Sequence, residues 1–518
     1  MNIEELTIQE LIKNRAKTPA DLAMIKRKIA KKYKTSCSSN IILLKVYHKM
    51  VGKKRLKLSK ILEKLLQTRP IRSLSGIVNV SVLTSPYPCP GKCIYCPFQK
   101  GIPKSYLPGE PAVERAKRLD YNPYQQVKKR IEMLKMEGHP IDKIDIRIIG
   151  GTWSYYPKKY QTWFITHCFT ACNAKYTRKI KSLEKEQKLN EKAKCRVVGL
   201  SIETRPDFIT KKEIKHLRKL GVTRVEIGVQ NIYDDVLELN KRGHNIKTTI
   251  KATKLLKDAG FKVCYQMMLN LPGSNLKRDE KMFEELFSNS DFQPDLLKIY
   301  PCALLKQAPL YRWWKKGKYK PYTTSQLINL VKSIKKKIPY YVRIQRITRD
   351  IPSQEIVAGP AKISNLRQII AKDSENEDWE CHCIRCREVK ENYNSKEKIK
   401  LFRQNYKASD GKEIFLSFES KNQEKLYSLL RLRISSENKA IIREIHTYGR
   451  AIPISEKKSA PQHKGLGKRL LKEAEKIAKK EFGLNKIKVI SGVGVRNYFG
   501  KLGYKLENTY MVKHFEKL

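Results

Sequence analysis

The sequence predicts an α/β protein in which a basic helical N-terminal segment precedes two successive α/β domains. Three observations predict this order. Lysine and arginine dominate residues 1–76, strand-like and helix-like segments alternate over residues 77–364, and strands flank one long amphipathic helix over residues 388–518. Residues 365–387 separate the two α/β regions and hold a tight group of cysteines, so we expect a metal-binding linker there.

Composition limits what the chain can be. Of its 518 residues, 40% are hydrophobic and 31% are charged, which is typical of a folded globular protein and excludes a disordered one. The apolar runs are too short to span a membrane, and residues 1–5 lack the features of a signal peptide, so we expect a cytoplasmic protein with no membrane partner. The formal net charge of +57 indicates a polyanionic partner, and nucleic acid is the obvious candidate.

The N-terminal segment is strongly basic, with 19 Lys and Arg against 5 Asp and Glu in residues 1–75. Thr18–Asp21 has the pattern of a helix start with proline in the first turn. Two basic runs follow, Lys26–Lys32 and Lys53–Lys57. A solvated helix face would explain either run alone, but two runs in one small segment favour a surface for backbone phosphates.

The first α/β region contains seven strand candidates, which predict a parallel sheet or partial barrel with its active site at the carboxyl ends of the strands. The candidates are Val78–Thr84, Ile144–Ile149, Val197–Ile202, Val225–Val229, Val263–Leu269, Leu297–Tyr300 and Val342–Ile347. The charge-rich stretch Lys175–Lys194 interrupts the repeat, and we expect it to be an exposed insertion.

Cys89, Cys93 and Cys96 follow the first strand with the spacing C-x3-C-x2-C. Three thiolates suit a four-iron [4Fe-4S] cluster that keeps one iron open for a ligand. The alternatives are a structural zinc site, which normally takes four ligands, or three core cysteines. At the end of a strand that opens a βα series, the motif resembles the radical S-adenosylmethionine (SAM) superfamily, in which the open iron binds SAM.

Polar strand ends supply candidate SAM contacts. A glycine pair at the end of the second strand would let the amino group of SAM approach the backbone, and polar side chains end the next two strands. Each could equally be an ordinary polar strand end. The candidates are Gly150, Gly151, Glu203, Arg205 and Gln230.

A second cysteine cluster has the spacing C-x-C-x2-C and comprises Cys381, Cys383 and Cys386. It lies between the two α/β regions, where a structural zinc ion would clamp the linker. No fourth ligand is evident, because His382 is adjacent to two of the ligands and its geometry is doubtful. A second iron–sulfur cluster and free thiols are the alternatives.

In the C-terminal domain, the strand Ile441–Tyr448 is followed by the loop Gln462–Gly467, whose glycines open an amphipathic helix. Glycines at a helix mouth expose backbone N–H groups to an anion. With the later segment Asn497–Tyr504, this order resembles the GNAT superfamily of acetyltransferases. That superfamily commonly has a tyrosine as general acid where this chain has Phe499, so the adjacent Tyr498 is the catalytic candidate.

The pairing of these two domains resembles the family of Elongator catalytic subunits, whose archaeal form acts alone. The resemblance rests on Ser201–Asp207, Gly228–Gln230, Asn240–His244, Arg349–Pro352 and Ile490–Gly494. It implies a tRNA-modifying enzyme that moves the acetyl group of acetyl-CoA, by SAM-derived radical chemistry, to C5 of the wobble uridine, giving 5-carboxymethyluridine. An electron donor for the cluster is then required, and the basic N-terminal segment is expected to bind tRNA.

The same resemblance assigns residues to acetyl-CoA. They are Lys143, Glu444, Ile445, His446, Thr447, Gly465, Leu466, Gly467, Lys468 and Phe499. Two other functions stay open at this point. One is a protein lysine acetyltransferase with a structural iron–sulfur domain, which the net charge and Phe499 disfavour. The other is a non-enzymatic tRNA-binding scaffold, which two complete cofactor motifs disfavour.

Overall fold

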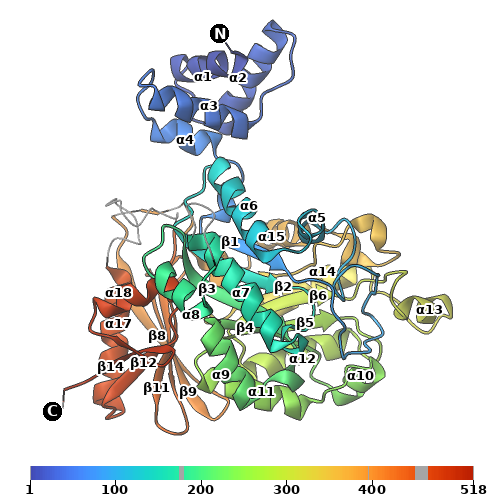
Figure 1. Ribbon diagram of the computed structural model, residues 1–518. Helices are drawn as coiled ribbons and strands as arrows, with labels where there is room; N and C mark the ends of the chain where they lie inside the picture. The colour runs from blue at the N-terminus through green and yellow to red at the C-terminus, as the bar shows by residue number, and fades with distance from the viewer. Residues whose placement is uncertain (1, 174–179, 392, 395, 450–464, 517–518) are drawn as a thin grey trace.

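A computed structural model describes residues 2–173, 180–391, 393–394, 396–449 and 465–516. Its N-terminal part is a unit of four helices that stands apart from the body and meets it beside α6 (Figure 1). These helices are α1 (Ile3–Lys13), α2 (Pro19–Lys32), α3 (Asn40–Gly52) and α4 (Lys60–Leu66). The unit has its own apolar core, which includes Ile8, Ile25, Leu44 and Tyr47. Thr18 and Asp21 form the capping box that starts α2, as the sequence predicts.

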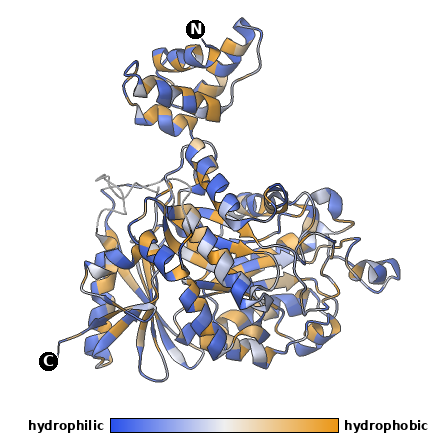
Figure 2. Ribbon diagram, in the orientation of Figure 1, coloured by the Kyte–Doolittle hydropathy of each residue, from blue (hydrophilic) through white to orange (hydrophobic). Residues whose placement is uncertain are grey.

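The first sheet has seven parallel strands in the order β1 to β7, with β1 and β7 at its open edges. It is an open barrel, and the buried apolar residues of its strands form one core cluster with those of the covering helices. Figure 2 shows hydrophobic residues along both the strands and the helices. Its strands are β1 (Val78–Leu83), β2 (Lys143–Ile149), β3 (Arg196–Thr204), β4 (Arg224–Gln230), β5 (Lys262–Leu269), β6 (Leu296–Pro301) and β7 (Arg343–Arg346). Each strand expected from the sequence is present, and the predicted α/β class is confirmed.

Helices follow most of these strands, and most of them cover the barrel, whereas α13 projects away from it (Figure 1). They are α5 (Pro111–Lys117), α6 (Pro123–Met136), α7 (Lys158–Asn173), α8 (Leu183–Asn190), α9 (Lys211–Leu220), α10 (Asp234–Leu239), α11 (Ile246–Asp258), α12 (Leu276–Ser288), α13 (Leu310–Lys315), α14 (Thr324–Lys336), α15 (Leu366–Asn376) and α16 (Ile384–Arg387). None of the helices in the described ranges is long and apolar enough to cross a membrane.

The prediction that Lys175–Lys194 is an exposed insertion is correct only in part for its described residues. Residues 174–179 lie outside the described residues, and the lysines that follow them are exposed, but α8 packs against α7 and buries one face. The Glu186 carboxylate accepts a hydrogen bond from Asn173, and Asn190 donates to the carbonyl of Cys195. The buried polar groups of this face are therefore satisfied by neighbouring polar groups.

The second sheet also has seven strands, in the order β13-β14-β12-β11-β10-β9-β8. Its strands are β8 (Ile399–Ala408), β9 (Gly411–Ser420), β10 (Leu426–Ile434), β11 (Ala440–Thr447), β12 (Lys486–Val489), β13 (Lys505–Glu507) and β14 (Tyr510–His514). Helix α17 (Leu466–Lys476) continues as a π-helix over Ile477–Glu481, and the short α18 (Arg496–Gly500) precedes β13.

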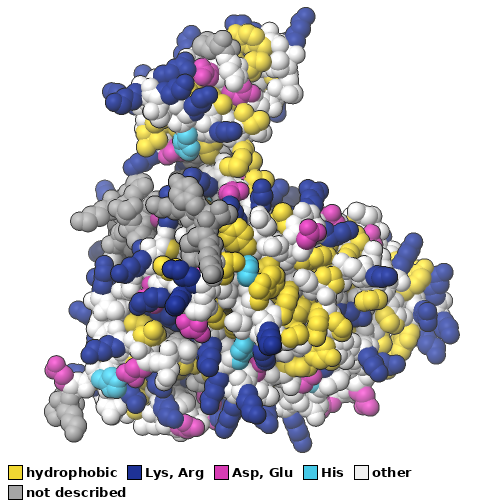
Figure 3. Space-filling view, in the orientation of Figure 1, with side chains coloured by type: hydrophobic (Ala, Val, Ile, Leu, Met, Phe, Trp, Pro, Cys, Tyr) yellow, Lys and Arg dark blue, Asp and Glu magenta, His cyan; other side chains and the backbone are white. Residues whose placement is uncertain are grey.

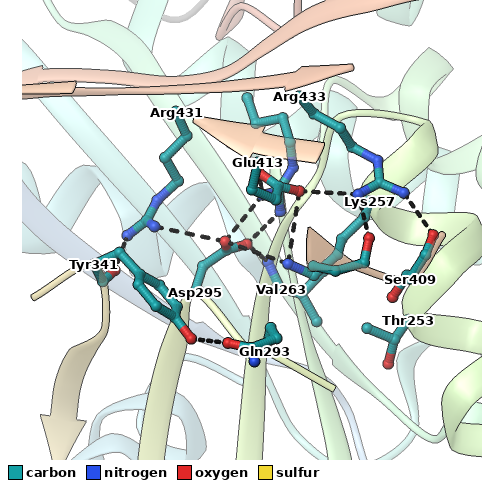
Figure 4. Close-up of polar contacts among 12 residues, drawn as sticks. Thr253, Lys257, Val263, Gln293, Asp295, Tyr341, Ser409, Glu413, Arg431 and Arg433 are labelled. Atoms are coloured by element: carbon teal, nitrogen blue, oxygen red, sulfur yellow. Dashed lines mark hydrogen bonds and ion pairs between the residues drawn. The ribbon is translucent and has the colours of Figure 1, made fainter. Parts of the chain in front are cut away.

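The two domains are joined by a fully buried charge cluster (Figure 4). Asp295, just before β6, accepts a hydrogen bond from Arg443 of β11 at 2.9 Å. Arg443 also donates to Glu413 of β9 at 2.9 Å, and Lys257 of α11 lies 3.8 Å from Asp295. All four side chains are at most 1% exposed. Buried charges of both signs meet across the interface, so each domain supplies counterions for the other.

The interface also depends on backbone contact. A Cβ added to Gly492 would lie 2.2 Å from the carbonyl oxygen of Val198 in β3, which is too close for any side chain. Gly494 is similarly tight against Arg196 at the start of β3. Small residues at these positions therefore let the second domain lie directly on the first strands of the barrel.

Candidate active site: two cavities at opposite ends of one barrel

Two cavities open at the two ends of the barrel. The radical cavity, of about 590 Å³, lies at the carboxyl ends of the strands and is lined by the first cysteine cluster. The acyl cavity, of about 530 Å³, lies at the amino ends of the strands, between the barrel and β11 of the second domain. The two names refer to the chemistry that the sequence predicts for the residues of each cavity, and we use them below. The structure therefore brings the two groups of predicted residues to opposite ends of a single barrel.

The first cysteine triad lines the radical cavity together. Cys89 and Cys93 lie on either side of Gly91, whose added Cβ would be 3.7 Å and 3.5 Å from their sulfurs. Among the described residues, the sulfurs of Cys89, Cys93 and Cys96 do not all lie within 4.8 Å of one another, so these thiols are spread around the cavity. A four-iron cluster binds each cysteine to a different iron, so a spread triad at a cavity wall fits the cluster better than a single small ion.

Arginines surround the cluster site. Arg242 donates a hydrogen bond to the Cys93 sulfur at 3.4 Å and another to the Gly228 carbonyl at 2.5 Å. Burial acts to raise the pKa of Cys93, but the charges of Arg242 and Arg205 bring it below its ordinary value. Arginine charge therefore stabilises the thiolate form, which is the form that binds metal.

Several buried polar atoms in the radical cavity lack a partner within the described part of the chain. They include Nη1 of Arg205 and Oε1 of Gln230. Unsatisfied buried donors and acceptors beside three thiols fit a bound polar group such as the amino acid portion of SAM.

The predicted SAM residues do not all reach the cavity. Gly151, Glu203, Arg205 and Gln230 line it, whereas Gly150 does not. Gly150 has φ +125, and a Cβ there would lie 2.1 Å from the Thr84 hydroxyl, so this glycine allows close packing of β2 against β1. The SAM assignments stay predictions, and Gly150 has a packing role in any case.

The acyl cavity is built largely on backbone. β11 pairs with β12 only from Ala440 to Ile442, and the two strands then separate. Among the described residues, no strand pairs with Glu444–His446 on the β12 side, and these residues line the cavity together with Thr447. Unpaired strand N–H and C=O groups facing a cavity can bind an extended amide-containing arm, such as the pantetheine of CoA, as an added strand.

The glycine loop lies at one end of the acyl cavity. Gly465, Gly467 and Lys468 line it, whereas Leu466 is buried in the core. Gly465 has φ +70 and begins α17, whose N-terminus can bind an anion. The first part of the predicted loop, Gln462–Lys464, lies outside the described residues.

Tyr498 and Phe499 both line the acyl cavity, although they are neighbours on a helix. The Tyr498 hydroxyl would lie 3.5 Å from a Cβ at Gly467, so it faces the glycine loop. Phe499 is buried and packs edge-on against Tyr498 and Tyr504. Tyr498 is therefore the residue of this pair with a hydroxyl available to a ligand, and burial raises its pKa.

Neighbouring charges and burial shift the pKa values of the ionisable residues at the barrel end of the acyl cavity. Burial opposes ionisation of Glu444, but Lys262 at 3.1 Å and Arg431 at 2.9 Å hold its pKa well below the ordinary value. His446 has its pKa lowered by burial, and its Nε2 lies 2.8 Å from the Ser75 carbonyl. Nε2 must donate to that carbonyl, which leaves Nδ1 as a proton acceptor. Burial also lowers the pKa of Lys143, which lines this cavity.

The second cysteine triad differs from the first. The ligand atoms of Cys381, Cys383 and Cys386 all lie within 4.8 Å of one another, and no fourth His, Cys, Asp or Glu joins them in the described chain. Sulfurs on one tetrahedral zinc ion lie about 3.8 Å apart, given Zn–S bonds near 2.3 Å. The triad fits zinc better than a four-iron cluster. His382 instead stacks on Tyr340 at 4.6 Å.

Sequence reasoning missed several charged residues inside the barrel. Arg242, Arg147 and Lys298 line the cavities but were not assigned. The available signal was the alternation of charged and apolar residues within strands, as in Lys143–Arg147 of β2. In a strand of a covered parallel sheet, such alternation indicates that one face borders a polar interior.

Comparisons with known proteins agree with this architecture. Residues 86–286 match the radical SAM superfamily, and residues 294–376 match the radical SAM C-terminal domain. The chain is 47% identical to a tRNA uridine(34) acetyltransferase of Methanocaldococcus infernus over 88% of both proteins. It is 37% identical to human Elongator complex protein 3 over 95% of this chain and 93% of that protein.

A solved structure is similar over most of the chain. It is the archaeal Methanocaldococcus infernus Elp3 with residues 1–46 deleted, which is 42% identical in sequence. The match covers 86% of this chain and all of that chain, with a TM-score of 0.74. Together with the matched radical SAM regions and the two cavities, these similarities show that the chain belongs to the family of tRNA uridine(34) acetyltransferases and Elongator complex protein 3.

Proposed function

We propose that this chain modifies the wobble uridine of tRNA by joining the two-carbon unit of acetyl-CoA to C5 of the base, which gives 5-carboxymethyluridine. One observation carries the proposal: a single barrel opens at one end into a cavity lined by three cysteines and at the other into a cavity lined by unpaired backbone and a glycine loop. The names of the relatives supply the substrate class and the position.

Cys89, Cys93 and Cys96 hold a [4Fe-4S] cluster in this proposal, and SAM binds beside it near Gly151, Arg205 and Gln230. When bound, this pair supplies a radical that can take a hydrogen atom from an unactivated methyl group. An external electron donor must reduce the cluster. In the overall balance, one methyl hydrogen ends on deoxyadenosine, the C5 hydrogen leaves as a proton with one electron returned, and water converts the thioester to a carboxylate and CoA.

Acetyl-CoA occupies the acyl cavity. Its pyrophosphate binds at Gly465 and Gly467, where the α17 N-terminus attracts phosphate, and its pantetheine arm follows the β11 backbone at Glu444–His446, beyond the last residue of β11 that pairs with β12. The acyl end then reaches the barrel beside Lys143. Neutral His446, with Nδ1 as its proton acceptor, is placed to take a proton from the water that hydrolyses the thioester.

The tRNA approaches the radical cavity. Arg69, Arg72, Arg115 and Arg130 line this cavity where the N-terminal unit joins the barrel. The pKa values of Arg115 and Arg130 are lowered by burial and then by the neighbouring charge of Arg72, which is the sign of cations crowded together. With the exposed Lys and Arg side chains of the N-terminal unit (Figure 3), they form a surface suited to a phosphate backbone.

The proposal also covers the second cysteine triad, the domain boundaries and the cellular location. Cys381, Cys383 and Cys386 bind zinc and clamp the linker against the start of β7, where the Ile384 amide donates to the Val342 carbonyl at 2.9 Å. The domain boundaries proposed are 76/77, 364/365 and 387/388. The reaction takes place on cytoplasmic tRNA.

The test is mass spectrometry of the wobble nucleoside after anaerobic incubation of the reconstituted protein with tRNA, SAM, a reductant and acetyl-CoA. We expect 5-carboxymethyluridine, with both added carbons labelled when [¹³C₂]acetyl-CoA is used. Arg403→Gln serves as a control variant that should keep full activity, because Arg403 is a surface arginine paired with Glu481. Unlabelled or unmodified uridine from a protein that cleaves SAM would contradict the proposal.

A further inference from the structure

The two cavities meet at one side chain. Of the described residues that line each cavity, Arg147 alone lines both. It lies on β2 two residues after Asp145, so both side chains point to the interior of the barrel. Arg147 therefore occupies the constriction between the acyl cavity and the radical cavity.

The other charges inside the barrel already have partners. Asp145 pairs with Arg224 at 3.1 Å, and Arg224 pairs with Glu226 at 3.3 Å. Lys298 pairs with both Glu226 and Glu203, which extends the series to the radical cavity. Burial acts against the charge on Asp145, but the surrounding cations lower its pKa to about 2, so it stays ionised. These ion pairs hold the charged side chains next to Arg147 in place.

Arg147 itself keeps unused donors. Its Nε donates to Asp145 at 3.3 Å, and its terminal amino groups have no hydrogen-bond partner among the described residues. Its side chain is 30% exposed, against 6% for Arg224. A guanidinium has five N–H donors in a fixed planar arrangement, and it binds oxygen acceptors well. An oxygen ligand at the constriction would satisfy it.

The shape of the acyl cavity indicates which oxygen this is. The glycine loop and the unpaired β11 backbone lie at one end, and the amino ends of the barrel strands lie at the other. A CoA molecule with its phosphates at the loop therefore directs its acyl group toward Arg147. The acetyl thioester has one good hydrogen-bond acceptor at that end, its carbonyl oxygen.

We propose that Arg147 binds the carbonyl oxygen of the acetyl thioester and holds the acyl group at the constriction, where its methyl carbon faces the radical cavity. The inference rests on the proposed function. It means that acetyl-CoA and tRNA enter from opposite ends of the barrel, and that the acyl group meets the radical while it is still attached to CoA.

A binding experiment tests the contact without turnover. The probe is acetonyl-dethia-CoA, a ketone analogue that cannot be hydrolysed, labelled with ¹³C at the carbonyl and added to protein lacking SAM. A hydrogen bond from a guanidinium moves the carbonyl resonance downfield. We expect this shift with the wild type, a reduced shift with Arg147→Lys and none with Arg147→Gln. Because loop and β11 contacts remain, the affinity should change by no more than about 10-fold. The same downfield shift in Arg147→Gln overturns the proposal.

Turnover separates this proposal from the proposed function. Arg147→Gln should lower carboxymethyluridine formation by about 10- to 100-fold, the value of a charged hydrogen bond, while uncoupled SAM cleavage stays within about twofold. Guanidinium ion added to Arg147→Ala should restore part of the rate, which a purely structural defect would not allow. A wild type that makes no product contradicts the proposed function. An active wild type with an equally active Arg147→Gln contradicts only the role of Arg147.

A labelling arm tests whether the acyl group stays on CoA. Unlabelled acetyl-CoA is supplied with excess [¹³C₂]acetate, and the product is analysed by mass spectrometry. We expect no label in the base. Label in the carboxymethyl group would show that free acetate crosses the constriction, and it would overturn the thioester assignment.

Discussion

The radical cavity and the acyl cavity are built by different means. In the radical cavity, the groups that face a ligand are side chains, namely three thiols, buried arginines and unpartnered polar atoms such as Gln230 Oε1. In the acyl cavity, the main ligand groups are backbone, at the separated strand β11 and the glycine loop. Truncating side chains should therefore strongly weaken ligand binding in the radical cavity. Binding in the acyl cavity should be weakened mainly by added bulk or charge.

The largest effect is expected from replacing Cys89, Cys93 and Cys96 together with alanine. Without thiolates the cluster has no ligands, so the brown absorbance of the reconstituted protein and all SAM cleavage should disappear. The affinity for acetyl-CoA, measured by calorimetry, should not change, because the acyl cavity lies at the other end of the barrel. A large loss of CoA binding would break the separation between the cavities.

Replacing a cysteine that lies outside both cavities tests whether the effect on SAM cleavage is specific to the first triad. Cys383→Ser should release the zinc ion proposed for this triad and lower the free energy of unfolding by about 4 kcal/mol, because metal loss loosens the linker that holds the three cysteines. Metal analysis and chemical denaturation measure these two effects. SAM cleavage per folded molecule should stay within about twofold of the wild type, since loss of one residue far from the chemistry costs stability rather than activity. A cleavage defect in fully folded Cys383→Ser would place the second triad in the reaction.

Gly467→Glu tests the dependence of the acyl cavity on backbone. A carboxylate would compete with the pyrophosphate for the loop amides, and acetyl-CoA affinity should fall by about 100-fold, or about 2.7 kcal/mol. Ile445→Ala is the matched truncation on β11, and it should cost less than about threefold, because the Ile445 backbone is retained. Equal losses in both variants would show that side chains, rather than backbone, bind CoA here.

The smallest effect concerns His446, a side chain of functional interest in the backbone-lined cavity. Burial depresses its folded-state pKa below the unfolded value near 6.5, so the unfolded state binds the extra proton as the pH falls. Its contribution to stability is complete above about pH 6.5 and is lost below it, with a slope of at most about 1.4 kcal/mol per pH unit. His446→Gln should flatten the acid side of the unfolding free energy between pH 6.5 and 5. An unchanged slope would show that the fold does not lower the pKa of His446.

Much of the fold could be predicted because strand and helix patterns here are local. Each barrel strand lies where a short apolar run was expected, and the family resemblance is confirmed by the relatives. The prediction that Lys175–Lys194 is exposed missed the buried face of α8, because burial of Glu186 depends on a partner, Asn173, from another helix. The roles of Gly492 and Gly494 could not be derived from local pattern either, since both are set by contact with β3 across the domain interface.

The candidate site shows the same division. The two cysteine triads could be predicted from the sequence because the ligands of one metal site often lie close together in the chain. The meeting of Lys143 with Glu444 and His446 required a family resemblance, because they lie on different domains and only the fold brings them to one cavity. The role of Arg147 depends on an observation that no sequence pattern contains, namely that two cavities end at the same side chain.

The buried charge cluster between the domains constrains how such proteins can be recombined. A chimera that takes its second domain from a distant acetyltransferase would place Asp295 and Lys257 against a surface lacking Glu413 and Arg443. Leaving a buried charge without its counterion costs more than a typical core mutation. Exchange of modules along this chain is therefore restricted to donors that carry the matching charges, and interface electrostatics, rather than catalytic residues, would be the first criterion for choosing them.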